Sequence, residues 1–308
     1  MAMQSQSGFD HPITLPHGAP ASCRPLNAPA AFSLVVAGLL AVFVNASPEL
    51  CAQEKNISES SRNATEPELK GILSPADRGK AIARWEKEIA RLERLDRTHD
   101  DPENAVMLMG SSSIRLWEDA AEMLAPYPII RRGYGGARYS DLVVFAKRLV
   151  SPHEYRALVV FVANDITGSN ADRPVDAVRK MVLHVIAVSQ EHQPDAPVLL
   201  VEVTPTPSRW GVWPQIRELN AMMREIALTH PGVSFVSTAQ YYLDDQDVAR
   251  PELFRQDQLH QNEPGYQIWA DIIRRRLDEV LGGATPPATA SAKSSSQQEV
   301  SGAAIEGK

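Results

Sequence analysis

The sequence predicts an α/β fold, a three-layer α/β/α sandwich around a parallel sheet. Two observations carry this prediction. Short runs of almost wholly apolar residues recur between residues 105 and 236, and amphipathic helices separate the later runs. Apolar runs that do not alternate with polar residues indicate strands buried on both faces. Strands that alternate with helices indicate parallel βαβ units, whose ligands bind at the carboxyl ends of the strands.

The elements follow one another in a single domain, which we expect to span residues 73–283. A helix opens it, since Ser74 is a suitable N-cap and Pro75 suits the first turn. The apolar runs cover residues 105–109, 128–130, 157–162, 198–203 and 233–236. Helical spacing of apolar residues follows the third run at 175–186 and the fourth run at 216–226, and a last helix opens at Pro264-Gly265.

Residues 1–52 have the character of a leader. From Ala30 to Val44 every residue is apolar or small and none is charged. Fifteen residues are too few to span a bilayer comfortably, since spanning takes about 20. They fit the apolar region of a signal peptide, with cleavage after Ala52. An uncleaved anchor and a buried core helix are the alternatives. We therefore expect an exported protein, periplasmic or extracellular, which stays on the membrane only if the leader is retained.

The segments that flank the domain are polar or of low complexity. Residues 53–72 are predicted to form a disordered linker, and residues 284–308 a disordered tail rich in Ala, Ser, Pro and Gln. Both cysteines, Cys23 and Cys51, lie in the leader. Cleavage after Ala52 would leave no cysteine for a disulfide, a nucleophile or a cysteine-based zinc site.

The charge balance argues against one class of partner. The 308 residues carry a formal net charge of −7 and contain no basic cluster that is evident in the sequence. Nucleic-acid binding needs a basic surface, so we expect no nucleic-acid partner.

Polar residues gather in four loops of the predicted domain. Three of these loops follow apolar runs, and the fourth precedes the last helix. They read Gly110-Ser111-Ser112-Ser113, Arg132-Gly133-Tyr134-Gly135-Gly136, Asn164-Asp165 and Asp257-Gln258-Leu259-His260. The carboxyl ends of parallel strands share one edge, so we expect these loops to meet.

The pair Asp257 and His260 suits the chemistry of ester hydrolysis. A serine nucleophile needs a base to take its proton and a carboxylate to orient that base. A spacing of three residues lets one turn bring both side chains to the same site. For each of the other histidines after the leader, a surface or core position is the better interpretation.

Ser112 is the candidate nucleophile because it ends a buried strand and opens a helix. Free backbone N–H groups at that point favour a developing oxyanion. The plain alternative is that the three serines only cap a helix. Likewise Gly136 is either a turn glycine or an oxyanion donor, and Asn164 either a helix cap or a second donor. Their combined position at the expected strand ends favours the catalytic interpretation.

These four blocks resemble those of the SGNH hydrolase superfamily, the GDSL-like lipases and esterases, over roughly residues 74–282. The resemblance implies a flavodoxin-like sandwich with about five parallel strands. It also implies Ser112, Asp257 and His260 as catalytic triad, with Ser112, Gly136 and Asn164 as oxyanion donors. The form GSSSIRLW is similar to a bacterial branch of the family.

Two residues depart from the family pattern, and rival enzyme classes fit less well. Ser111 stands where the family usually has Asp, and Val162 where it usually has Gly, yet no catalytic group is missing. An α/β-hydrolase would show G-x-S-x-G around its nucleophile. Zinc peptidases would show H-E-x-x-H. Neither motif occurs, so we expect a reaction that needs no metal and no other cofactor.

The expected function is a serine esterase that acts through an acyl-enzyme. No long apolar lid segment is evident, which favours a short acyl group, such as acetyl on a small-molecule or glycan substrate. Trp117 and Trp210 are candidate sugar-binding side chains, with a core or rim position as the equal alternative. A non-catalytic glycan-binding module and an acyltransferase with the same triad remain as alternative functions.

Overall fold

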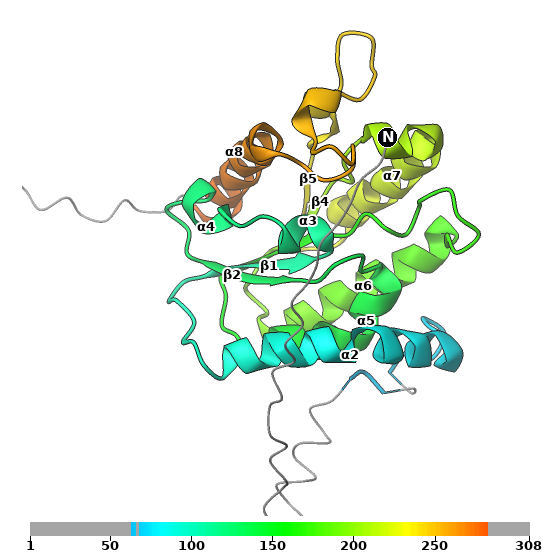
Figure 1. Cartoon of the computed structure of the whole chain (residues 1–308). Coiled ribbons are helices and arrows are strands. Elements are labelled where there is room, and N and C mark those ends of the chain that lie inside the picture. Colours follow the sequence, from blue (N-terminus) through cyan, green and yellow to red (C-terminus); the bar gives the residue numbers. More distant parts are fainter. Residues whose placement is uncertain (1–62, 66–67, 283–308) are drawn as a thin grey trace, which may run out of the picture. The chain divides into compact units, whose positions relative to one another are not determined.

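The apolar runs form the five strands of one parallel sheet, in the order β2-β1-β3-β4-β5 (Figure 1). This is the order of flavodoxin-like folds. The computed structural model describes residues 63–65 and 68–282, so the predicted leader and tail lie outside the described residues. The strands are β1 (Val106–Gly110), β2 (Ile129–Gly133), β3 (Ala157–Phe161), β4 (Val198–Val201) and β5 (Val233–Val236).

Helices connect the strands and cover both faces of the sheet (Figure 1). The α-helices are α2 (Pro75–Asp96), α3 (Ser112–Arg115), α4 (Ala120–Met123), α5 (Tyr139–Val150), α6 (Val175–His192), α7 (Trp213–Thr229) and α8 (Glu263–Leu281). Short 3₁₀ turns are η1 (Pro207–Val212), η2 (Ala239–Tyr242) and η3 (Pro251–Leu253). Within the described residues, none of these helices combines the length and hydrophobicity of a membrane span.

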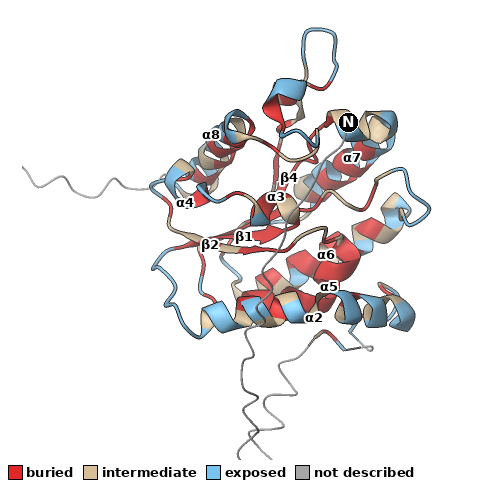
Figure 2. Ribbon diagram, in the orientation of Figure 1, coloured by how far each residue is buried: buried red, intermediate tan, exposed pale blue. Residues whose placement is uncertain are grey.

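The central strands β1, β3 and β4 are apolar throughout because each face of the sheet packs against its own set of helices, whereas the edge strand β2 carries Arg131 and Arg132 (Figure 2). In β1, Met107 and Met109 belong to the core formed with α2, α5, α6 and α7. Val106 and Leu108 belong to the opposite core, formed with α3, α4 and α8. The predicted three-layer sandwich is therefore confirmed, and every strand of the sheet ends at the edge where the polar loops lie.

The domain begins earlier in the chain than the sequence predicts. Part of the expected linker, residues 63–65 and 68–72, packs against the domain. Leu69 is 1% exposed, and the Ala64 N–H donates to the carbonyl of Val144 in α5 at 2.9 Å. Ala64, Leu69 and Leu73 belong to the same hydrophobic core as the buried residues of α2 and α5. They carry no helical or strand periodicity, which is why the sequence suggested disorder.

Candidate active site

Ser112 is positioned by the sharp turn between β1 and α3. Gly110 has φ +151°, and a Cβ there would lie 1.9 Å from the carbonyl oxygen of Phe161 in β3. Only glycine lets β1 approach β3 this closely at the turn. The Ser111 N–H then donates to that same carbonyl at 3.0 Å. Ser112 begins α3, and its own N–H has no acceptor within the described part of the chain.

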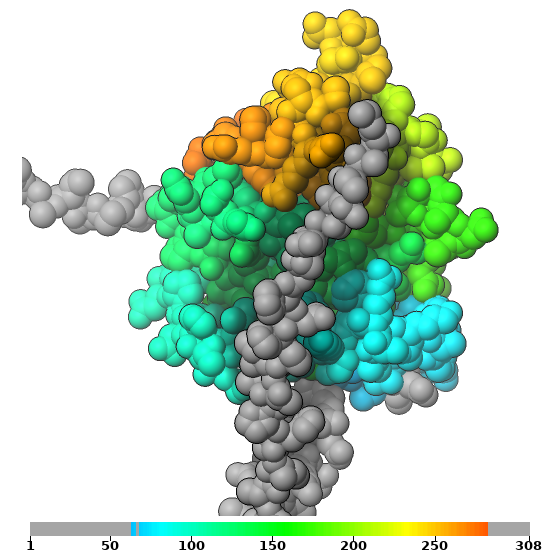
Figure 3. Space-filling view, in the orientation of Figure 1, coloured from blue at the N-terminus to red at the C-terminus, as the bar shows by residue number. Residues whose placement is uncertain are grey.

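Asp257 and His260 are held in one tight turn of the segment between β5 and α8, gold to orange in Figure 3. One carboxylate oxygen of Asp257 accepts the N–H groups of Leu259 and His260, both at 3.0 Å. Gln258 has φ +54°, which closes the turn. One turn thus brings the side chains of Asp257 and His260 to the same place, as their spacing of three residues led us to expect.

The three predicted triad residues form a continuous chain of contacts. Ser112 Oγ lies 2.8 Å from His260 Nε2, and His260 Nδ1 lies 2.6 Å from Asp257 Oδ2. Partial burial raises the pKa of Asp257, but hydrogen bonds from His260 and two backbone N–H groups outweigh it and lower this pKa to about 2. An ionised carboxylate only accepts, so Nδ1 carries the ring proton and Nε2 of the neutral ring is free to take one from Ser112.

Asn164 follows β3 and is oriented by Arg209, which follows β4. Arg209 Nη2 donates to Asn164 Oδ1 at 2.6 Å, and Nη1 donates to the carbonyl of Ala163. The two N–H donors of the guanidinium thus fix the orientation of the Asn164 amide, with Oδ1 toward Arg209. Asn164 Nδ2 donates one hydrogen to the carbonyl of Ala137 at 2.9 Å. An amide nitrogen carries two hydrogens, so one remains for a ligand.

Gly136 lies in the loop after β2, which the Asn164–Ala137 bond ties to the end of β3. Its φ is +69°, and its N–H has no acceptor within the described residues. Gly136 does not line the cavity at Ser112, and no direct contact joins it to the triad. Its predicted role as an oxyanion donor therefore stays a prediction.

The cavity at this site is small. It is lined by Ser112, Asn164, Arg209 and His260 among others, and its volume of about 20 Å³ is close to what one water molecule needs. Thr204, 3% exposed, also lines it, and its hydroxyl has no partner among the described residues. Buried polar groups are normally paired, so this hydroxyl is free to bond a bound ligand.

The two tryptophans predicted to bind sugar differ in position. Trp117 is 1% exposed, stacks on Tyr266 at 5.4 Å and meets Trp269 edge-on. A ring with no exposed face cannot support a sugar, so the predicted role of Trp117 is wrong. Trp210 is half-buried beside Arg209 and stacks on Trp213 at 6.2 Å. Its predicted role stays a prediction.

Sequence reasoning missed Arg209 and Thr204. Both follow the fourth apolar run, and so lie at the predicted functional edge of the sheet. Their position after an apolar run could have marked both residues as candidates for the site. The Arg209–Asn164 contact itself joins residues 45 positions apart, and no local pattern marks it.

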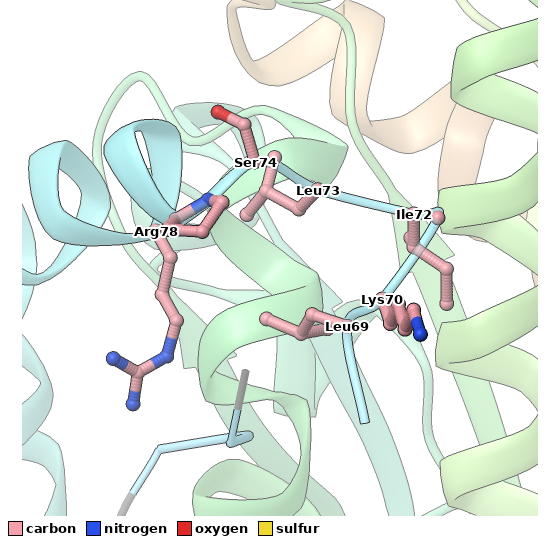
Figure 4. A pocket seen from close by; sticks show the side chains of 8 residues that line it. Leu69, Lys70, Ile72, Leu73, Ser74 and Arg78 are labelled. Carbon is pink, nitrogen blue, oxygen red and sulfur yellow. The ribbon is translucent and has the colours of Figure 1, made fainter. Parts of the chain in front are cut away.

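A larger hollow lies away from this chemistry. About 780 Å³ in volume, it is lined by the segment Leu69–Ser74 together with Pro75 and Arg78 (Figure 4). It shares no lining residue with the cavity at Ser112. The Arg78 side chain is already bonded to the Ala64 carbonyl at 2.7 Å. The smaller cavity, with its nucleophile and base, is the better candidate site.

Solved structures with the same fold extend over most of the domain. A GDSL-like lipase from Bacteroides thetaiotaomicron aligns with a TM-score of 0.55 and 18% identity, covering 62% of this chain and 97% of that one. A candidate platelet activating factor from Streptococcus pneumonia gives 0.54 and 19%, covering 65% and 95%. At such identities the likeness establishes the fold alone.

The comparison of sequences identifies the family. No curated protein gives a significant match. The family model of the GDSL-like Lipase/Acylhydrolase family matches residues 105–268, just over half of the 308 residues. The match runs from β1 through the His260 turn into α8. This chain belongs to the GDSL-like lipase/acylhydrolase family.

Proposed function

We propose that this protein is a serine esterase that removes short acyl groups, such as acetyl, from a carbohydrate through an acyl-enzyme. The observation that carries the proposal is the contact chain from Ser112 Oγ through His260 to Asp257, with heavy-atom distances of 2.8 and 2.6 Å. These distances suit proton transfer from a hydroxyl to a histidine base that a carboxylate holds. An intact series of contacts between nucleophile, base and carboxylate favours an enzyme over a non-catalytic glycan-binding module.

The proposed reaction has two steps. His260 Nε2 takes the hydroxyl proton while Ser112 Oγ attacks the ester carbonyl carbon, and the electron pair moves to the carbonyl oxygen. The bond to the alcohol then breaks, and His260 returns the proton to the leaving oxygen. Water repeats the sequence on the acyl-enzyme and releases the acid. Asp257 stabilises the ring while it is charged.

The developing oxyanion would be bound by the free N–H of Ser112, the second amide hydrogen of Asn164 and the N–H of Gly136. Each such donor contributes about 3 kcal/mol to the transition state. These donors and the triad act without a metal ion. The small cavity at Ser112 supports a short acyl group, because a long chain would find no enclosed space beside the nucleophile. The exposed alcohol part would then lie outside the cavity.

The experiment is a comparison of 4-nitrophenyl esters of increasing acyl length, followed by acetylated xylo-oligosaccharides. We expect kcat/KM to be highest for acetate and to fall as the chain lengthens. Ser112→Ala should lower kcat at least about a thousandfold. Ser113→Ala is the matched control and should stay active. Equal activity of Ser112→Ala and wild type would contradict the mechanism, and a preference for long chains would contradict the substrate.

A further inference from the structure

A basic groove lies beside the proposed active site, where α2, α3 and the loop after the edge strand β2 meet. Its volume is about 420 Å³. The groove is lined by one carboxylate, that of Glu88, and by five cations. The cations are Arg84, Lys87, Arg91, Arg94 and Arg115. The chain as a whole has a net charge of −7, so this concentration of positive charge is local.

Several of these cations are not neutralised by the protein. Arg91 is paired with Glu88 at 2.8 Å, and Arg84 lies over the ring of Trp85 at 4.6 Å. All five cations are exposed, and Lys87, Arg94 and Arg115 differ from the other two in lacking such a partner in the described part of the chain. Within the described residues, none of these three has a carboxylate within ion-pair distance. Five cations share the single carboxylate of Glu88, so the groove keeps a surplus of positive charge, and an anion there would be bound favourably.

Two glycines of the loop after β2 lie against cations of the groove. A Cβ on Gly135 would lie 3.2 Å from Nε of Arg115, and a Cβ on Gly136 would lie 3.5 Å from a guanidinium nitrogen of Arg84. Gly136 is the proposed oxyanion donor. Arg115 also lies one turn after Ser112 in α3. The groove and Ser112 are thus joined through α3, which carries both Ser112 and Arg115.

We propose that this groove binds an anionic group carried by the alcohol part of the substrate, so that the preferred substrate is an acylated acidic carbohydrate. The anionic group must belong to the alcohol part of the ester, because the cavity at Ser112 has room only for a short acyl group. Guanidinium groups bind carboxylate, phosphate and sulfate alike through paired N–H donors. This inference rests on the proposed esterase function and names its substrate class.

The test compares an acidic and a neutral acetyl ester, namely acetylated oligogalacturonides and acetylated xylo-oligosaccharides, at low ionic strength. Wild type should show a higher kcat/KM for the acidic ester, and the preference should shrink as salt is added. Lys87→Glu should lower the ratio of acidic to neutral kcat/KM about tenfold. Lys180→Glu, an exposed lysine in α6, makes the same charge change elsewhere and should leave the ratio unchanged.

Binding measured without turnover separates this proposal from the esterase proposal. Calorimetry on Ser112→Ala should show that unacetylated oligogalacturonide binds more tightly than neutral xylo-oligosaccharide, and that adding Lys87→Glu abolishes the difference. Competition by sulfated and phosphorylated oligosaccharides identifies which acidic group fits best. Equal ratios in the Lys87 and Lys180 variants, or equal binding of acidic and neutral oligosaccharides, would overturn the groove assignment. Loss of hydrolysis of every ester with acidic binding intact would overturn only the esterase function.

Discussion

Asp257 holds His260, and Arg209 holds Asn164, so that two side chains of the Ser112 site have their atoms fixed by a neighbour. The first pair could be predicted from the sequence because its partners share one turn. The second pair could not, because the fold alone brings the loops after β3 and β4 together. A sequence motif also does not show whether a side chain is buried. For that reason Trp117 was a candidate for sugar binding although it belongs to the core.

The Arg209 contact predicts a coupled effect on catalysis. Asn164→Ala should lower kcat with KM nearly unchanged, because an oxyanion bond strengthens only in the transition state. Arg209→Ala should act in the same direction, since it frees the amide to rotate. The double variant should lose little more than either single variant. Steady-state kinetics measures all three, with exposed Arg217→Ala as control. Additive losses, or a change confined to KM, would mean that Arg209 does not act through Asn164.

Asp165 predicts a pH-dependent stability. It is fully buried, and burial raises the pKa of its carboxyl to about 7 although the Tyr139 N–H opposes this. The unfolded value is about 3.9. The folded state therefore keeps a proton that the unfolded chain loses. The contribution of protonated Asp165 to the free energy of unfolding is therefore fully present below about pH 4. It is lost as the pH rises to about 7, by at most about 1.4 kcal/mol per pH unit.

The variant Asp165→Asn cannot titrate, yet its amide oxygen can still accept the Tyr139 N–H. Its free energy of unfolding relative to wild type should therefore rise between pH 5 and pH 7. Denaturant unfolding at several pH values measures this difference. Asp245→Asn, at an exposed position, serves as control and should run parallel to wild type. A parallel curve for Asp165→Asn would show that the carboxyl stays ionised throughout.

At the scale of elements, the site depends on how closely the strands meet at their carboxyl ends. The order of the elements and the apolar runs could be read from the sequence, because period and composition are local. The exact fit of β1 against β3 could not, since it depends on contacts between residues 51 positions apart, Gly110 and Phe161. Only the structure shows that the glycine before the serines is required by packing and not only by the turn.

Gly110→Ala tests this fit. Its Cβ would collide with the Phe161 carbonyl, and backbone on both sides cannot move aside without breaking the β1–β3 pairing. We expect a loss of several kcal/mol of stability, or no soluble protein. Gly79→Ala is the matched control, because it lies exposed in α2 with open space around its Cβ. It should raise the free energy of unfolding by about 1 kcal/mol. Equal behaviour of the two variants would contradict the packing argument.

At the scale of the molecule, the sheet edge gathers loops from four strands and the turn before α8 into one site. The sequence predicted this edge and its domain, but it placed the start of the domain too late. Ala64 and Leu69 sit among polar residues, so composition suggested a linker. Tertiary packing against α5 overrides that local signal.

The packed segment before α2 should contribute to stability. Leu69→Ala removes a side chain that is 1% exposed and should lower the free energy of unfolding by about 2–4 kcal/mol. Leu228→Ala removes a side chain that is 81% exposed and should change it by less than about 0.5 kcal/mol. Chemical denaturation compares them. If Leu69→Ala were as stable as Leu228→Ala, residues 63–65 and 68–72 would not belong to the folded domain.

The identity of the nucleophile is tested most directly by labelling with a fluorophosphonate, followed by peptide mass spectrometry. Ser111 and Ser113 are 1% and 7% exposed, whereas Ser112 faces His260 at 2.8 Å. We expect the probe to label Ser112 alone, and His260→Ala to abolish the labelling because the hydroxyl then keeps its proton. Labelling of Ser111 or Ser113, or ester hydrolysis that continues after Ser112 is fully labelled, would contradict the assignment of Ser112 as nucleophile.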